Sequence, residues 1–167
     1  MFQVGDYIVY GGHGVCQVKE IGLMKSSIDG QSRNCYTLVP CYSKETVIFT
    51  PVDNKKVIMR QIMTREEAEG LIDHMKEAEP LKISDEKRRE QSYKDAMRTC
   101  EADQLVKMIK AIYQRSQRRT RQGKKATDSD SRYFKMAEDC LYGELALSLE
   151  IDKEKVGEYI KSRIGNE

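Results

Sequence analysis

The feature that most constrains the fold of this chain is a pair of β-type segments near its N-terminus, joined through glycines. Residues 7–10, Tyr-Ile-Val-Tyr, alternate between two faces as a strand requires. Glycines on both sides of His13 permit the positive φ angles of a tight reversal, and β-type residues resume at Val15. The chain is therefore predicted to open with a β-hairpin.

Further short β-type segments follow, separated by turn signals. A mixed stretch over 21–28 ends at Asp29-Gly30, and later segments cover 36–39, 46–50 and 56–59. Short strands at this spacing predict a Tudor/SH3-like five-stranded β-barrel over residues 1–62, a fold that binds partners far more often than it catalyses. The apolar run Val47-Ile-Phe49 fits either a fully buried strand or an exposed edge that pairs with a strand of another protein.

From Thr64 onward the apolar spacing changes to the helical period. Thr64 and Glu67 form a capping box, and Pro80 marks a linker. Further helices are expected over about 84–99 with Ser84 as cap and over about 102–119. A third should follow Ser129 or Asp130, one of which would be its cap, and a last helix should begin at Asp152. The helix over about 130–149 is apolar around much of its circumference and should form the centre of the helical core. We therefore predict an α+β chain of two domains: a β-barrel (1–62), a linking helix and linker (63–82), and an all-α domain of four to five helices (83–167).

Positive charge is concentrated in the middle of the chain. Residues 1–81 carry 9 Lys or Arg and 11 Asp or Glu, residues 82–125 carry 14 and 6, and residues 126–167 carry 6 and 10. The middle block therefore has a net charge of +8, although the whole chain has only +2. This asymmetry indicates a polyanionic partner.

Two basic patches make up this block. Between Gln104 and Thr127 the chain has eight cations and no acid: Lys107, Lys110, Arg115, Arg118, Arg119, Arg121, Lys124 and Lys125. The earlier patch comprises Lys87, Arg88, Arg89, Lys94 and Arg98. If the two helices that carry them are antiparallel, both patches share one end of the domain. Nucleic-acid contact explains so many unopposed charges better than a solvated helix end that complements its dipole.

The cysteines and histidines give little support to catalysis. The five cysteines include no Cys-x-x-Cys pair, so neither a zinc ribbon nor a disulfide framework is indicated. A metal site built from His13, Cys16, Cys35 and Cys41 would match no common spacing, and His74 lies among charged residues. We expect reduced thiols in a cytoplasmic protein without signal peptide, membrane span, cofactor or enzymatic activity.

Several segments together resemble one family. They are Phe2–Tyr10 followed by His13-Gly14-Val15, then Tyr36–Val39, the strand that ends at Pro51 and Asn54 after it, and finally Tyr93-Lys94 and Leu141–Leu147. In this order they resemble the CarD/CdnL family of bacterial transcription regulators. The opening segment is also similar to the polymerase-binding module of transcription-repair coupling factors, but the chain carries no helicase motif.

The resemblance implies a specific activity. The N-terminal domain would bind the β subunit of RNA polymerase, and the helical domain would contact promoter DNA near the upstream edge of the transcription bubble with little sequence specificity. Binding both would favour the open complex through differential affinity, without a cofactor. We expect a monomer. The alternative is an RNA- or ribosome-associated module with an SH3/KOW-like barrel.

The resemblance also assigns site residues. The polymerase-binding residues would be Met24, Lys25, Val47, Ile48, Phe49, Thr50 and Pro51. Phe49 stands where family members often have Arg. The helical domain lacks the family's tryptophan wedge, and alignment on Tyr93-Lys94 places Arg89 there. The predicted DNA-binding residues are Lys87, Arg88, Arg89, Tyr93, Lys94, Arg115, Arg118, Arg119, Arg121, Lys124 and Lys125, those of the basic loop 120–125 contacting phosphates.

Overall fold

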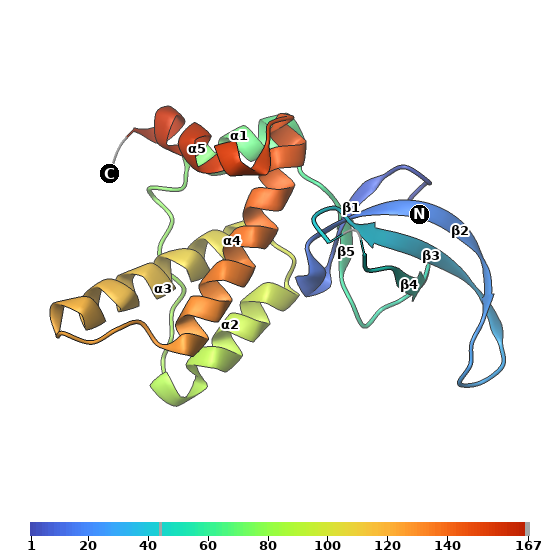
Figure 1. Cartoon of the computed structure of the whole chain (residues 1–167), viewed down its shortest axis with the longest axis horizontal. Helices are drawn as coiled ribbons and strands as arrows, with labels where there is room; N and C mark the ends of the chain where they lie inside the picture. The colour runs from blue at the N-terminus through green and yellow to red at the C-terminus, as the bar shows by residue number, and fades with distance from the viewer. Residues whose placement is uncertain (44, 166–167) are drawn as a thin grey trace.

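The computed structural model describes residues 1–43 and 45–165, so the last two residues of the predicted helical domain lie outside the described residues. A β-sheet and a group of helices lie side by side, and the long helix α4 stands between them (Figure 1). The five strands are β1 (Tyr7–Tyr10), β2 (Val15–Lys25), β3 (Ser32–Pro40), β4 (Ile48–Pro51) and β5 (Met59–Gln61). They form one antiparallel sheet in the order β4-β3-β2-β1-β5.

The predicted opening hairpin is confirmed. Ile8 pairs with Cys16 across β1 and β2, and a single 3-10 turn, Gly11–His13, connects the strands. Gly11 has a φ of 48°, and a Cβ there would lie 2.7 Å from Cγ1 of Val57. Both the turn and its packing therefore require glycine at this position.

Alternation along the strands creates the sheet core. Ile8, Val18, Tyr36 and Leu38 are buried on one face of the sheet. The stretch 21–28 that looked mixed in sequence covers the second half of β2 and the start of the turn after it, and an irregularity between Val18 and Glu20 shifts the alternation within β2. The pairings leave β4 and β5 as the two edges, so the five predicted strands are present in an open sheet and not in a closed barrel.

The helices are α1 (Arg65–Asp73), α2 (Arg89–Arg98), α3 (Ala102–Arg121), α4 (Asp128–Leu149) and α5 (Val156–Ile164), with 3-10 turns η2 (Glu86–Arg88) and η3 (Lys153–Lys155). The capping box of α1 is confirmed: the Glu67 N–H donates to Thr64 Oγ1 at 3.1 Å, and the Thr64 N–H donates to Glu67 Oε1 at 3.1 Å. None of these helices is long and apolar enough to cross a membrane, within the part of the chain that the structure describes.

Two predicted caps are wrong. Asp85, and not Ser84, accepts a hydrogen bond from the N–H of Lys87 at the start of η2. Thr127 caps α4 by accepting from the N–H of Asp130. Asp130 itself lies inside the first turn of α4, with its carboxylate directed to side chains of other helices.

The helical core surrounds α4. Leu141, Leu145 and Leu149 are buried, as the sequence predicted for the centre of this core. Ala68 and Ile72 of α1 belong to the same cluster, so the predicted linking helix packs on the helical part. The other side of α4 faces the sheet (Figure 1).

Candidate functional site

The outer face of the sheet brings distant predicted residues together. Phe49 on β4 lies opposite Thr37 on β3, and Met24 lies near the end of β2 on the same side. These three residues and Cys35 line a shallow hollow of about 170 Å³. Phe49 is 56% exposed and Met24 is 36% exposed, whereas alternate residues such as Tyr36 point into the core. Lys25, next to Met24, is exposed at the end of β2.

β4 is an edge strand, so of the two alternatives that the sequence left open the fully buried strand is wrong, and pairing of this edge with a partner strand stays a prediction. The N–H of Val52 donates to the carbonyl of Asn34 at 3.0 Å, and hydrogen-bonded pairs alternate along an antiparallel ladder. The N–H and C=O of Phe49 therefore point to the free edge, and Pro51 has no N–H to donate. The side chains of the predicted segment 47–51 differ in exposure. Val47 and Phe49 are exposed and Pro51 is half-buried, whereas Thr50 and much of Ile48 are covered by the core.

The β2–β3 hairpin, which projects from the rest of the sheet, adds apolar surface that the sequence analysis missed (Figure 1). Leu23 is 73% exposed, and Ile28 in the turn is 96% exposed. Arg33 binds the Asp29 carboxylate across the turn, and these hydrogen bonds lower the pKa of Asp29 to about 2. An isoleucine among turn residues was the signal available in the sequence.

A buried carboxylate organises the basic end of the helices. Asp130 has no exposed surface, and its Oδ1 accepts from Arg89 Nε at 3.0 Å and from the Tyr93 hydroxyl at 3.0 Å. Its Oδ2 accepts from Arg115 Nε at 2.8 Å, and Arg115 also donates to Glu86 Oε2 at 2.6 Å. The start of α2, the latter part of α3 and the start of α4 thus meet, so Arg89 of the earlier basic patch and Arg115 of the later patch lie at one end of the helices. Lys110, in the first half of α3, lies elsewhere and donates to the carbonyls of Lys76 and Ala78 after α1.

This network removes three predicted residues from the exposed surface. Tyr93 is fully buried, and burial beside Asp130 raises its pKa. The side chains of Arg89 and Arg115 are only 15% and 18% exposed and are paired with carboxylates. Arg89 and Tyr93 are therefore not placed to replace a wedge that inserts into DNA. Sequence reasoning treated Asp130 only as a possible cap, although it is an acid that closely follows a long run of cations.

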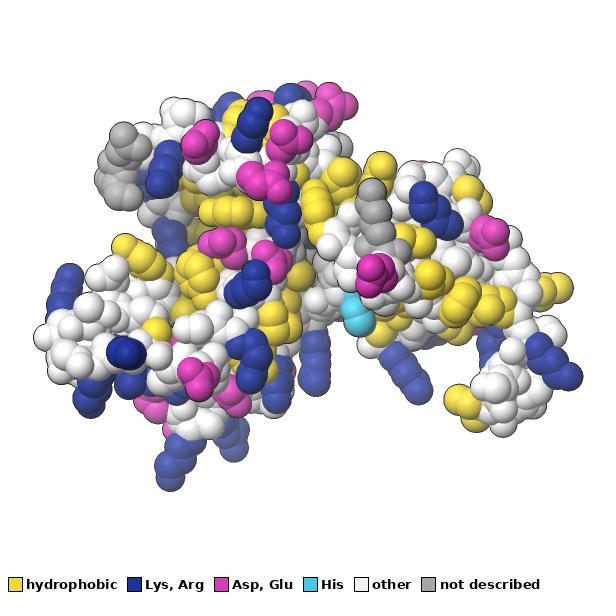
Figure 2. All heavy atoms as spheres, in the orientation of Figure 1, with side chains coloured by type: hydrophobic (Ala, Val, Ile, Leu, Met, Phe, Trp, Pro, Cys, Tyr) yellow, Lys and Arg dark blue, Asp and Glu magenta, His cyan; other side chains and the backbone are white. Residues whose placement is uncertain are grey.

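The remaining predicted cations lie around this end of the helices. The Arg119 Nε donates to the carbonyl of Lys125 at 2.8 Å, which fixes the loop after α3. Seven others are exposed: Lys87, Arg88, Lys94, Arg118, Arg121, Lys124 and Lys125. Figure 2 shows Lys and Arg side chains along the lower and left rims of the helical part.

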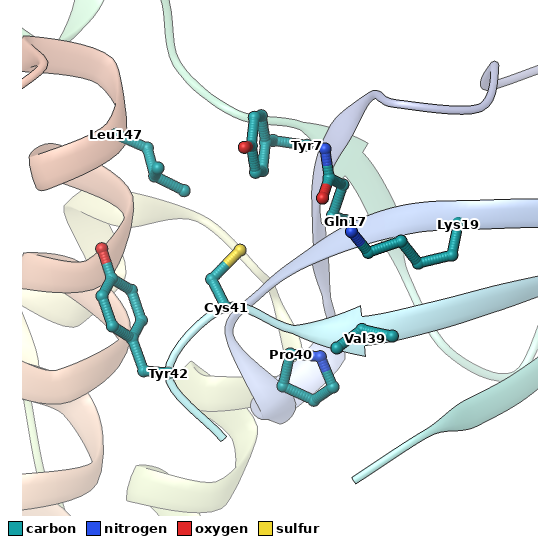
Figure 3. A pocket seen from close by; sticks show the side chains of 8 residues that line it. All are labelled: Tyr7, Gln17, Lys19, Val39, Pro40, Cys41, Tyr42 and Leu147. Atoms are coloured by element: carbon teal, nitrogen blue, oxygen red, sulfur yellow. The ribbon is translucent and has the colours of Figure 1, made fainter. Parts of the chain in front are cut away.

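A groove of about 360 Å³ lies between the sheet and α4. Tyr7, Cys41 and Tyr42 approach it from the sheet side, and Leu147 approaches it from α4 (Figure 3).

The cysteines and histidines that the sequence weighed as catalytic or metal-binding residues have structural surroundings. Burial raises the pKa of Cys16 to about 12, so this thiol is a poor nucleophile. The ring of His13 contacts that of Tyr10 in a tilted arrangement, with 5.5 Å between the ring centroids. Within residues 1–43 and 45–165, no group of three or more His, Cys, Asp or Glu could hold a metal ion.

Comparison with known protein families identifies the part of the chain that contains the five strands. Residues 2–63 match the family model described as CarD-like/TRCF RID domain, where RID denotes an RNA polymerase-interacting domain. The match begins before β1 and ends just before the capping box of α1. A search of curated proteins finds no match. The resemblance inferred from the sequence is confirmed for the N-terminal part of the chain: residues 2–63 belong to the CarD-like/TRCF RID family of RNA polymerase-interacting domains.

Proposed function

We propose that the protein binds the β subunit of RNA polymerase through its sheet and promoter DNA through the basic end of its helices, and so modulates the stability of the open complex. The observation that carries the proposal is the match of residues 2–63 to an RNA polymerase-interacting domain. The protein would act in the bacterial cytoplasm, at the nucleoid, as a monomer that catalyses no reaction.

The polymerase-binding surface in this proposal consists of the outer sheet face at Met24 and Phe49 together with the free edge of β4. An edge strand can accept a partner strand through main-chain hydrogen bonds, while exposed side chains provide specificity. The Phe49 main chain supplies a donor and an acceptor to such a partner. Its aromatic ring would bury apolar area where family members often use an arginine, so this contact would be insensitive to salt.

DNA contact would come from the seven exposed cations at the common end of α2, α3 and α4. Lys and Arg on a helix end and in a loop reach phosphates without reading bases, so we expect little sequence preference. Arg89, at the position of the family's wedge, is bound to Asp130. Any stabilisation of the bubble edge would therefore depend on backbone charge, with a weaker effect than an apolar wedge gives.

The mechanism is a shift between two states of the promoter complex. A protein that contacts both polymerase and DNA favours whichever state allows both contacts at once, by its difference in affinity for the two. Upstream DNA and polymerase take up different relative positions in the closed and open complexes. The proposed protein would bind the open arrangement more tightly and prolong its lifetime.

The test is capture of RNA polymerase by the full-length protein. Phe49→Asp places a charge on the proposed surface and should lower polymerase affinity at least tenfold. The matched control is Tyr113→Asp, which changes an aromatic residue of similar exposure, 57%, on α3. Unchanged capture by Phe49→Asp would refute the proposed surface. Sedimentation with ribosomes, without polymerase capture by the wild type, would support the alternative of a ribosome-associated module.

A further inference from the structure

Helix α4 has a second packed face. Leu141, Leu145 and Leu149 face the helical core, but a separate set at helical spacing faces the sheet. This set, here called the junction face, comprises Cys140, Gly143, Glu144, Leu147 and Ser148. Most of it falls within the segment 141–147 that carries part of the family resemblance.

Glu144 is the centre of the junction face. Its side chain is almost fully buried, and its carboxylate accepts from Arg60 Nη1 at 2.6 Å and from Nη2 at 2.8 Å. The same Arg60, on β5, donates through Nε to the carbonyl of Cys100 at 2.7 Å. One planar guanidinium therefore joins the sheet, α4 and the turn between α2 and α3. A bidentate pair with a third directional bond fixes an angle as well as a distance.

The chain segment that connects the two halves is also held. Met63 lies between β5 and α1, where a hinge would be expected. Its N–H donates to Glu144 Oε2 at 2.8 Å, and its carbonyl accepts from the Ser148 hydroxyl at 2.7 Å. Because both main-chain groups of Met63 are bound to α4, the connection is not free to rotate.

Tyr42 provides a second attachment point from the loop after β3. Its hydroxyl donates to the carbonyl of Gly143 at 3.1 Å, and Lys153 lies 4.7 Å from its ring centroid. A Cβ on residue 143 would lie 2.8 Å from Cε2 of Tyr42, so glycine is needed for this close approach. Figure 3 shows Tyr42 and Leu147 where the sheet meets α4.

We propose that the junction face is a rigid joint that sets the orientation of the polymerase-binding sheet relative to the basic end of the helices. This inference rests on the proposed function. It makes Arg60 and Glu144 positioning residues that touch neither polymerase nor DNA. Polymerase binding then presents the exposed cations to one particular stretch of phosphates. If the joint were loose, binding of the sheet to polymerase would only raise the effective concentration of the exposed cations near DNA and would not fix their orientation.

Residual dipolar couplings of the full-length protein test the joint itself. One alignment tensor should fit both the sheet and the helices of the wild type. In Glu144→Gln the amide would present N–H donors to Arg60, so the bidentate pair breaks and two different tensors should be needed. Asp128→Asn, which neutralises an exposed acid at the opposite end of α4 from Glu144, should keep a single tensor. A single, unchanged tensor in Glu144→Gln would overturn the proposal.

A second variant tests the joint if Glu144→Gln does not fold. Arg60→Met with Glu144→Leu removes both charges and leaves no unpaired buried ion, so it should fold. It also removes the directional bonds to Cys100 and Met63, so we again expect two tensors. A single, unchanged tensor in this variant would overturn the proposal as well.

Open-complex lifetime separates this inference from the proposed function. Glu144→Gln should retain the affinity for polymerase but shorten the open-complex lifetime at least threefold. If two tensors are needed and the lifetime is unchanged, while Phe49→Asp shortens it, the positioning role is refuted and the proposed function stands. If Phe49→Asp also has no effect on the lifetime, the proposed function fails, and the dipolar couplings still decide whether the joint is rigid.

Discussion

At the scale of single residues, identical side chains have different roles according to their partners. Arg115 and Arg118 lie one turn apart on α3, but Arg115 is bound to Asp130 and Glu86 while Arg118 is exposed. A buried carboxylate with two arginines and a tyrosine hydroxyl is fully satisfied, so its charge is tolerated in the interior. The removal of one partner leaves the others buried without compensation.

This arrangement predicts a large cost for Asp130→Asn. Two guanidinium groups would lose their common anion, and the free energy of unfolding should fall by about 3 kcal/mol or more. Urea denaturation measures this as a lower midpoint with an unchanged slope. Asp128→Asn, an exposed acid in the same helical turn, should cost less than about 1 kcal/mol, the size of a helix-dipole effect. Equal losses in the two variants would contradict the central role of the Asp130 network.

At the scale of secondary-structure elements, local signals were sufficient for most of the fold. The glycine-linked hairpin, the capping box at Thr64 and the leucine spacing of α4 depend on neighbours within a few residues, so the sequence predicts them directly. The cap at Asp130 was wrong because this residue is recruited by arginines from α2 and α3, which lie far away in the chain. The cap at Ser84 was wrong for a local reason, because the neighbouring Asp85 accepts the hydrogen bond from the Lys87 N–H. The edge position of β4 and the second face of α4 are likewise set by tertiary contacts that no local pattern contains.

The end of α3 and its loop give a prediction at this scale. The exposed cations Arg118, Arg121, Lys124 and Lys125 should each contribute to DNA affinity through counterion release. Replacement of all four by Gln should weaken DNA binding and reduce the slope of log K against log salt by about 0.9 for each phosphate that is no longer neutralised. Fluorescence anisotropy with duplex DNA at several salt concentrations measures this slope.

The control for this measurement lies in the loop between β4 and β5. Replacement of the exposed Lys55 and Lys56 by Gln lowers the net charge but leaves the basic end intact. If the Lys55 and Lys56 replacements reduced the slope by as much per removed charge as the four replacements on α3 and its loop, the binding would reflect overall charge and not the proposed surface.

At the scale of the whole molecule, the sheet and the helices share buried contacts. Val9 and Val15 of the sheet form one cluster with Cys100, which lies between α2 and α3, and Leu147 of α4 packs against it. The Arg60–Glu144 pair crosses the same boundary. If the sheet or the helices unfolded alone, this cluster would be exposed and a buried charge would lose its partner. Both effects oppose separate unfolding.

The molecule should therefore unfold as one cooperative unit. Val15→Ala creates a cavity in the shared cluster and should lower the unfolding free energy by about 2 kcal/mol. Native-state hydrogen exchange should report the same loss for the amide of Tyr36 in β3 and that of Leu145 in α4, because both exchange through the same global opening. Val47→Ala, at an exposed position, should change both by less than about 0.5 kcal/mol. A loss confined to Tyr36 would mean that the sheet opens while the helices stay folded, and the two surfaces would then be coupled by chain connectivity alone.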